Sequence, residues 1–243
     1  MKQNSYDNPG FFAKYSQMPR SIGGLDAAGE WSVFRAMLPE LRDKKVLDLG
    51  CGYGWHSRYV REQHASSVVG VDLSEKMLER ARAMTQDEQI QYQRSAIEDI
   101  NYSEGEFDVV LSSLALHYVE DFDSICRKVY HSLAPGGTFV YSVEHPVYTA
   151  LPEQDWVYGV QGEKLHWPVD RYHEEGPRTA RFLDHDVVKY HRSIATQVNG
   201  LINSGFRIRE MSELKPEKQL VERDPEWKNA HRRPIFLLIA ADK

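Results

Sequence analysis

The sequence predicts an α/β protein built on a mostly parallel sheet, and two features of the chain predict it. From Val46 onward, short apolar runs alternate with helix-like stretches, which is typical of strand, crossover helix and parallel strand. The first run enters a glycine-rich turn, and the second ends on Asp72. The 243 residues, 41% hydrophobic and 27% charged, suffice for a sizeable core. We therefore expect one domain over 1–243 that contains one insertion.

The apolar runs and their turn residues give the expected order of elements. About seven strands are expected, at 46–49, 67–72, 90–92, 107–111, 138–143, 206–208 and 234–240. Ser74 is placed to cap a helix whose apolar residues recur at helical spacing, at Met77, Ala81 and Met84. A second helix is expected from about 121 to 133, ended by Pro135-Gly136-Gly137. A third is expected near 196–203, before Gly205.

Two segments break this alternation. The first is the N-terminal segment 1–40, whose polar and aromatic stretch at 6–20 we interpret as part of a lid with helical content. The second is the segment 146–190, which has no clear periodicity but is too aromatic for plain disorder. Long loops at the strand ends of such sheets tend to carry function, so we interpret 146–190 as a cap over a substrate cleft.

Composition and charge limit the partners and the compartment. A net charge of −6 disfavours nucleic acid, because nucleic-acid-binding domains usually carry a basic excess on the binding face. No apolar run approaches the roughly 18 residues that span a bilayer, and residues 1–21 lack the apolar centre of a signal peptide. The two cysteines, Cys51 and Cys126, fit a reducing compartment, so we expect a cytoplasmic protein without a membrane partner.

The most informative stretch is the glycine-rich turn within residues 46–54, Val-Leu-Asp-Leu-Gly-Cys-Gly-Tyr-Gly. Such a turn is able to hold a dinucleotide, a mononucleotide phosphate or an adenosyl compound. The dinucleotide fingerprint needs a third small residue, and counting from Gly50 or Gly52 that position is Trp55 or Ser57. No Gly-Lys-Ser or Gly-Lys-Thr follows, which excludes a P-loop. Asp48 repels a pyrophosphate but attracts a cation.

S-adenosylmethionine matches these features. It carries an ammonium and a sulfonium, a ribose diol that needs an acidic acceptor, and an adenine that needs an apolar slot. Asp72, at the end of the second expected strand, stands where a carboxylate accepts both ribose hydroxyls in sheets of this kind. The alternative for Asp72 is a helix-capping acid.

Four motifs in order resemble those of class I S-adenosylmethionine-dependent methyltransferases, particularly the small-molecule group that includes the quinone-biosynthesis enzymes. They are Val-Leu-Asp-Leu-Gly-Cys-Gly-Tyr-Gly at 46–54, Val-Val-Gly-Val-Asp-Leu-Ser at 68–74, Phe-Asp-Val-Val-Leu-Ser-Ser-Leu-Ala-Leu-His-Tyr-Val at 107–119 and Leu-Ala-Pro-Gly-Gly-Thr-Phe at 133–139. The resemblance implies a Rossmann-like seven-stranded sheet with an antiparallel last strand, helices on both faces and the cap after strand five. It covers roughly 46–143.

The resemblance also implies positions for the cofactor. Gly50 and Gly52 face its methionine part, Gly54 shapes the turn, and Asp72 takes the ribose. Leu73 and Met77 flank the adenine, the segment 95–98 contacts it, and Ser112 lies under the methionyl group. The expected cofactor site comprises Asp48, Gly50, Cys51, Gly52, Gly54, Asp72, Leu73, Met77, Ala96, Ile97, Glu98 and Ser112.

Methyl transfer from a sulfonium is an in-line displacement, and holding the nucleophile about 3 Å from the methyl carbon supplies much of the catalysis. A phenol, amine or thiol acceptor also needs a base, and His117 and His145 are the candidates; packing or cofactor bonding is the alternative role for His117. Arg20 is a candidate partner of the cofactor's carboxylate or of an acidic substrate, or a solvated arginine. The candidate substrate residues are Tyr15, Arg20, Tyr148 and Trp167.

Several alternatives stay open at this point. The remaining histidines lack metal-site spacing, so we expect no metal. Ser112-Ser113-Leu114-Ala115 stands where base-modifying DNA methyltransferases carry Asn-Pro-Pro-Tyr, which disfavours DNA. A tRNA methyltransferase, a non-catalytic S-adenosylmethionine-binding protein and an NAD(P)-dependent oxidoreductase are the competing interpretations. The identity of the small-molecule acceptor and the oligomeric state cannot be read from the chain.

Overall fold

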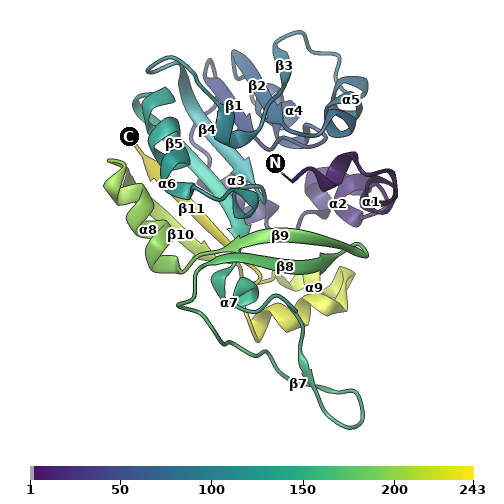
Figure 1. Cartoon of the computed structure of the whole chain (residues 1–243). Helices are drawn as coiled ribbons and strands as arrows, with labels where there is room; N and C mark the ends of the chain where they lie inside the picture. The colour runs from purple at the N-terminus through teal and green to yellow at the C-terminus, as the bar shows by residue number, and fades with distance from the viewer. Residues whose placement is uncertain (1–2) are drawn as a thin grey trace.

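A computed structural model of the chain describes residues 3–243, so the first two residues of the expected lid lie outside it. Its centre is a seven-stranded sheet of strand order β10-β11-β5-β4-β1-β2-β3. All its strands run parallel except β11, which is antiparallel to both neighbours, β5 and β10. The predicted fold class is thereby confirmed (Figure 1). The strands are β1 (Lys45–Leu49), β2 (Ser67–Asp72), β3 (Ile90–Arg94), β4 (Phe107–Ser113), β5 (Leu133–Glu144), β10 (Arg207–Glu213) and β11 (Phe236–Asp242).

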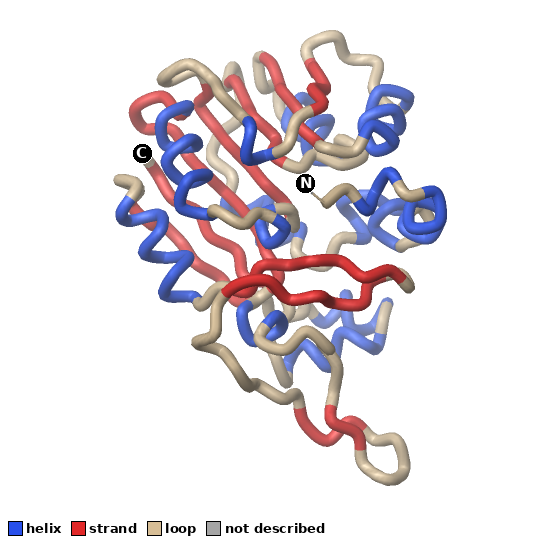
Figure 2. The backbone as a smooth tube through the Cα atoms, viewed as in Figure 1, coloured by secondary structure: helices blue, strands red, loops and turns tan. Residues whose placement is uncertain are grey.

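Helices cover both faces of this sheet (Figure 2). Successive side chains of a strand point to opposite faces, so Val46 packs in one apolar core and Leu47 in the other. The core around Leu47 includes residues of α6 and α8, and the core around Val46 includes residues of α3 and α4. The helices of the sheet region are α3 (Trp31–Met37), α4 (Trp55–Glu62), α5 (Glu75–Ala83), α6 (Phe122–Ser132) and α8 (Ile194–Asn203).

The predicted caps are present, with small shifts of the element ends. The Ser74 side chain accepts a hydrogen bond from the Met77 amide at the start of α5. α6 ends one residue before the predicted end, and strand β5 begins at Leu133, the expected last residue of the helix, and runs through the expected turn. Leu133 pairs with Phe107, the register then shifts, and regular pairing starts at Thr138 as predicted.

The expected lid folds into short helices, and the expected cap forms two hairpins. The N-terminal elements are η1 (Ser5–Asp7), α1 (Pro9–Tyr15), α2 (Pro19–Gly23) and η2 (Gly24–Ala27). The cap contains α7 (Pro146–Thr149), β6 (Val157–Tyr158), β7 (Lys164–His166), β8 (Gly176–Phe182) and β9 (His185–His191). Figure 1 shows the β8–β9 hairpin lying across the lower end of the sheet, with α1 and α2 beside it.

The sequence did not predict the β8–β9 hairpin, because polar residues fill three of its five buried positions. The buried positions of β8 alternate at Arg178 and Ala180, and those of β9 at Val187, Lys189 and His191. A two-residue period is therefore present in burial but absent in hydrophobicity.

The C-terminal part holds two further helices, α9 (Lys218–Arg223) and η5 (Pro225–His231), before β11. Strand β10 extends five residues past its expected end, to Glu213, and β11 is shifted by two residues relative to 234–240. Short helical turns η3 (Ile97–Asp99) and η4 (Leu116–Tyr118) follow β3 and β4. Within residues 3–243, no helix has both the length and the apolarity that crossing a bilayer requires.

The buried Arg178 of β8 gives a test of the hairpin's anchoring. Its guanidinium is 8% exposed and donates to the backbone carbonyls of Ala150 and Glu174. We expect Arg178→Met to lower the free energy of unfolding by about 2 kcal/mol, because buried acceptors lose their donor. Arg181→Met on the same strand removes an exposed ion pair with Asp186 and should change the free energy of unfolding by less than about 0.5 kcal/mol. Urea unfolding measures both; equal losses would contradict the anchoring role.

Candidate active site

A cavity of about 380 Å³ lies where β1, β2, β4 and β5 end, and residues of the N-terminal segment and of the cap close it. Parallel strands present their carboxyl ends at one edge of the sheet, so side chains distant in sequence meet there. Among the residues predicted for the site, those that line the cavity are Tyr15, Arg20, Gly50, Cys51, Gly52, Asp72, Leu73, Met77, Ala96, Ile97, Glu98, His117 and Tyr148.

The glycine turn after β1 has a backbone that favours glycine at three positions. Gly50, Gly52 and Gly54 have φ values of 75°, 52° and 70°. A Cβ on Gly50 would lie 2.3 Å from the Ala115 Cβ, and one on Gly54 would lie 2.0 Å from the Tyr92 hydroxyl. A Cβ on Gly52 would have no atom within 4 Å. Gly52 therefore leaves an open cradle at the cavity wall that a side chain would fill.

The Asp72 carboxylate joins this turn to the end of β2. Its Oδ2 accepts from the Gly52 amide at 2.9 Å, and its Oδ1 accepts from the Ser74 amide at 2.9 Å. Burial raises the pKa of Asp72 to about 6, while these amides favour the ionised form. Each oxygen keeps a free acceptor position, so the carboxylate is able to take two hydroxyl donors from a ligand.

The residues after β2 and β3 form the apolar side of the same end of the cavity. Leu73 and Met77 come from the start of α5, and Ala96 and Ile97 come from the start of η3. Asp7 of the N-terminal segment accepts from the Ser74 hydroxyl at 2.6 Å and from the Lys76 amide, which fixes that segment against α5.

Within residues 3–243, Arg20 is the one lysine or arginine that lines the cavity. Its guanidinium donates to the Glu30 carboxylate at 2.5 Å, and Glu30 is 2% exposed. Burial opposes the charge of Arg20, but the neighbouring Glu30 outweighs it, so the pKa of Arg20 lies above its usual value. Arg20 is thus paired with a buried carboxylate, although its own side chain remains 25% exposed. Nearby in the lining, the Trp55 Nε1 is buried and has no hydrogen-bond partner.

The two candidate bases differ in their position. His117 lines the cavity, and its Nδ1 accepts from the Glu144 amide at 3.4 Å. Burial lowers the pKa of His117 to about 4, so the ring is neutral and presents Nε2–H as a donor.

His145 lies outside the cavity lining and has both ring nitrogens occupied. Its Nδ1 accepts from the Val147 amide at 3.0 Å, and its Nε2 is 2.9 Å from the Glu213 Oε1. This buried ring caps α7 and ties the end of β5 to β10, and its geometry does not present it to a ligand.

Four other predicted residues also lie outside the lining and support it. Asp48 accepts from the Ser57 hydroxyl at 2.6 Å, and burial raises the pKa of Asp48 to about 7. The Ser112 hydroxyl donates to the Leu49 carbonyl at 2.8 Å, which joins β4 to β1. Trp167 stacks on Tyr148, with ring centroids 5.1 Å apart. Gly54 belongs to the glycine turn, and the Gly54 amide donates to the Cys51 carbonyl.

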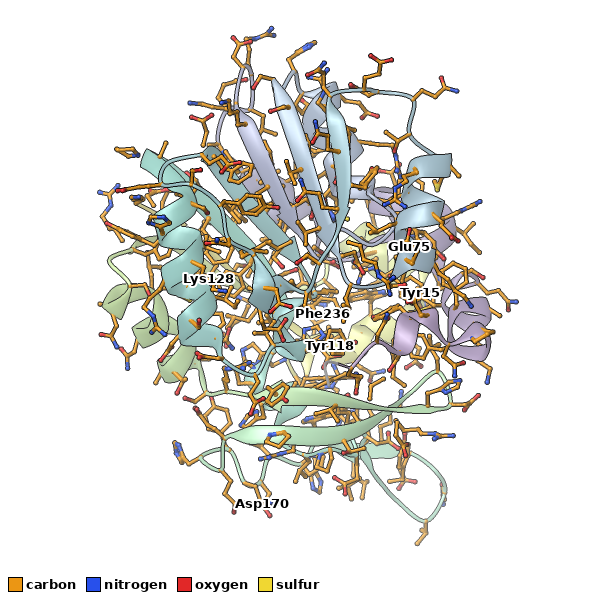
Figure 3. All side chains as sticks on the ribbon, turned by 45° about the horizontal axis from the view of Figure 1, so that its top comes forward. Tyr15, Glu75, Tyr118, Lys128, Asp170 and Phe236 are labelled. Atoms are coloured by element: carbon orange, nitrogen blue, oxygen red, sulfur yellow. The ribbon has the colours of Figure 1, made fainter. Side chains whose placement is uncertain are left out.

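The sequence interpretation did not single out several residues that line the cavity, among them Tyr6, Tyr118, Glu144 and Phe236. Figure 3 labels Tyr15, Tyr118 and Phe236, which come from α1, η4 and β11 and lie around the centre of the molecule. Tyr118 and Glu144 directly neighbour the two histidines that were chosen. Within residues 3–243, no three His, Cys, Asp or Glu side chains gather as a metal site requires.

Comparison with known proteins now identifies the class. The methyltransferase domain family model matches residues 47–141. A solved S-adenosylmethionine-dependent methyltransferase from Mesorhizobium loti is 46% identical, with a TM-score of 0.86, and the match covers 90% of this chain and all of that one.

The chain is also similar to two curated relatives. An uncharacterized protein of Haemophilus influenzae is 33% identical over 98% of this chain and 97% of its own length. A malonyl-[acyl-carrier protein] O-methyltransferase of Enterobacter lignolyticus is 34% identical over 54% of this chain and 50% of its own length. The chain belongs to the S-adenosylmethionine-dependent methyltransferases, as the four sequence motifs indicated.

Gly52 offers a test of the open cradle. We expect Gly52→Ala to bind S-adenosylhomocysteine at least tenfold more weakly, because the added methyl group enters the cavity. The positive φ should also cost about 1 kcal/mol of stability. Gly136→Ala is the matched control, since Gly136 also has a positive φ and open space around its Cβ, away from the cavity. Calorimetric titration should show unchanged affinity in the control; a similar loss in both variants would contradict the cradle.

Proposed function

We propose that this methyltransferase transfers the methyl group to a small-molecule acceptor bound in the 380 Å³ cavity. The observation that carries the proposal is the Asp72 carboxylate, held by the Gly52 and Ser74 amides at the cavity wall. A half-buried acid with free acceptor positions beside an open glycine turn suits a ribose diol attached to a cationic group.

The lining residues suggest how the cofactor lies along the sheet edge. The ribose sits at Asp72, and the adenine lies between the apolar side chains after β2 and β3, with Glu98 beside it. The methionine part passes over Gly52 toward Arg20. The unpartnered Trp55 Nε1–H and the Arg20 guanidinium are donors for its carboxylate.

The acceptor then occupies the part of the cavity between β4, β5 and the cap. His117, Glu144 and Tyr148 line that part, and the N-terminal Tyr6 and Tyr15 face it across the cavity. A volume of this size, closed by two chain segments, suits a small molecule better than a polymer. The net charge of −6 further disfavours a nucleic-acid acceptor.

The chain's own residues act mainly by orienting the reactants. When bound, S-adenosylmethionine supplies an electrophilic methyl group on a sulfonium. Arg20 and Asp72 anchor the two ends of the cofactor, and the aromatic walls exclude water and hold the acceptor in line. His117 donates a hydrogen bond through Nε2 rather than accepting a proton, since its Nδ1 is engaged.

The same proposal covers the organisation and location of the chain. Residues 1–40 act as a lid and 146–190 as a substrate cap on one domain over 1–243. Two free and buried cysteines, Cys51 and Cys126, are consistent with a cytoplasmic location.

Asp72→Ala tests the proposed cofactor site. We expect at least a tenfold loss of affinity for S-adenosylmethionine and S-adenosylhomocysteine, measured by isothermal titration, because the ribose loses its charged acceptor. Asp108→Ala, which removes a carboxylate at the amino end of the sheet, should leave the affinity unchanged. Unchanged binding in Asp72→Ala would remove Asp72 from the site, and tight binding without turnover on any acceptor would favour a non-catalytic cofactor-binding protein.

The pKa of Asp72 predicts a pH dependence of binding. The ligand prefers the ionised carboxylate of Asp72, whose pKa in the free protein is about 6. Below that pH, protonation of Asp72 competes with ligand binding. Affinity should be flat above that pH and fall by up to about tenfold per pH unit below it. Asp72→Asn should bind weakly, with an affinity that depends less on pH. Wild type and variant both contain Asp48, whose pKa is also raised, so a difference between their pH profiles comes from Asp72. Parallel profiles would refute the assignment.

A further inference from the structure

The acceptor end of the cavity contains a carboxylate that the cofactor does not need. Glu144 is the last residue of β5 and lines the cavity. Strands β5 and β2 are three neighbours apart in the sheet, and strands are spaced by about 4.8 Å, so the strands that end at Glu144 and Asp72 lie about 14 Å apart. Glu144 thus lies beyond the ribose site, on the side of the cap.

The cap holds this carboxylate from behind. Glu144 Oε1 accepts from the Lys189 Nζ at 2.6 Å, and Oε2 accepts from the Gln154 Nε2 at 3.0 Å. Neither Lys189 nor Gln154 lines the cavity, and Lys189 is 3% exposed. Burial opposes the charge of Glu144, but the Lys189 charge and the hydrogen bonds from Lys189 and Gln154 outweigh it, so the pKa of Glu144 is lowered. Each carboxylate oxygen retains an acceptor position for a donor in the cavity.

The walls around Glu144 are aromatic and uncharged. The lining there includes Tyr6, Tyr118, Tyr148 and Phe236. Burial, with the nearby Glu144 charge, raises the pKa of Tyr148 to about 12 and that of Tyr118 further. These hydroxyls therefore stay protonated. Aromatic faces and an ionised carboxylate together favour a group that is positively charged or becomes so during reaction.

We propose that the methyl acceptor is a small primary or secondary amine whose N–H donates to Glu144; this rests on the proposed function of the same cavity. The bound ammonium first releases a proton to water, and the freed nitrogen lone pair then forms the N–C bond as the C–S bond breaks, with the bonding pair going to sulfur. Positive charge thereby moves from sulfur to nitrogen, next to Glu144, and the methylated ammonium later releases its proton to water.

Other acceptor classes fit this end of the cavity less well. Carboxylates and phosphates would meet the Glu144 charge, and the cationic Arg20 is shared between Glu30 and the carboxylate of the cofactor in the proposed site. A hydroxyl must lose its proton during transfer, and a base with a pKa near the working pH does this best. His117, with a pKa of about 4 and its Nδ1 engaged, and Glu144, with a lowered pKa, are weak bases. A neutral amine keeps its proton through the transition state, so neither base is needed at the transfer step itself.

A matched set of probes tests the class of acceptor. The full chain saturated with S-adenosylhomocysteine is titrated with benzylamine, benzyl alcohol and benzoate, and the chain with S-adenosylmethionine is assayed for N- and O-methylated products by mass spectrometry. We expect benzylamine to bind at least tenfold more tightly than the alcohol or the acid and to be the methylated probe. Equal or weaker binding of the amine, or no amine binding, overturns the proposal.

Variants test Glu144 itself. Glu144→Gln should lower benzylamine affinity at least tenfold and leave the affinity for S-adenosylhomocysteine within about twofold. Because this variant leaves the buried Lys189 without its partner, Glu144→Gln combined with Lys189→Met is the second variant and should lose the amine equally. Glu153→Gln, at an exposed position of the cap, is the control and should match the wild type.

The outcomes separate this proposal from the proposed function. Wild-type protein that fails to bind S-adenosylhomocysteine refutes the cofactor site. Retained S-adenosylhomocysteine binding with unchanged benzylamine affinity in the double variant refutes the role of Glu144 alone.

Discussion

The hydrogen bond from the Gly52 amide to the Asp72 carboxylate joins two chain segments on which the cavity depends. It fastens the turn after β1 to the end of β2, while the amides of Gly50 and Cys51 donate to the Val71 carbonyl. This closure requires a backbone at positive φ and therefore glycine. A side chain at Gly52 would occupy the space that the turn leaves open, so the same constraint shapes the loop and the binding site.

Sequence reasoning predicted the sheet because its inner strands, such as β1, β4 and β11, are buried on both faces and read as apolar runs separated by glycine, proline and capping residues. It did not predict the β8–β9 hairpin, where the buried positions hold Arg178, Lys189 and His191. These side chains are buried because carbonyls, carboxylates and hydroxyls from other segments satisfy them, as Glu144 does for Lys189. Such partners are distant in sequence and invisible to a pattern of hydrophobicity.

The cofactor end of the cavity was more predictable than the acceptor end for a related reason. The glycines and Asp72 follow strand ends directly, and their backbone requirements are local. At the end of β5, adjacent residues point to opposite sides. The strand before them is buried on both faces from Gly137 to Val143, so nothing in the sequence indicated that Glu144, and not His145, lines the cavity.

The N-terminal contacts of α5 have a consequence for how the chain responds to ligands. Asp7 bonds the Ser74 hydroxyl and the Lys76 amide, and Ser74 in turn donates its amide to Asp72. Docking of the first turn of the protein and occupancy of the ribose position therefore share one short chain of hydrogen bonds. In the proposed cofactor site, any factor by which N-terminal docking changes the affinity for the ribose equals the factor by which the bound ribose changes N-terminal docking.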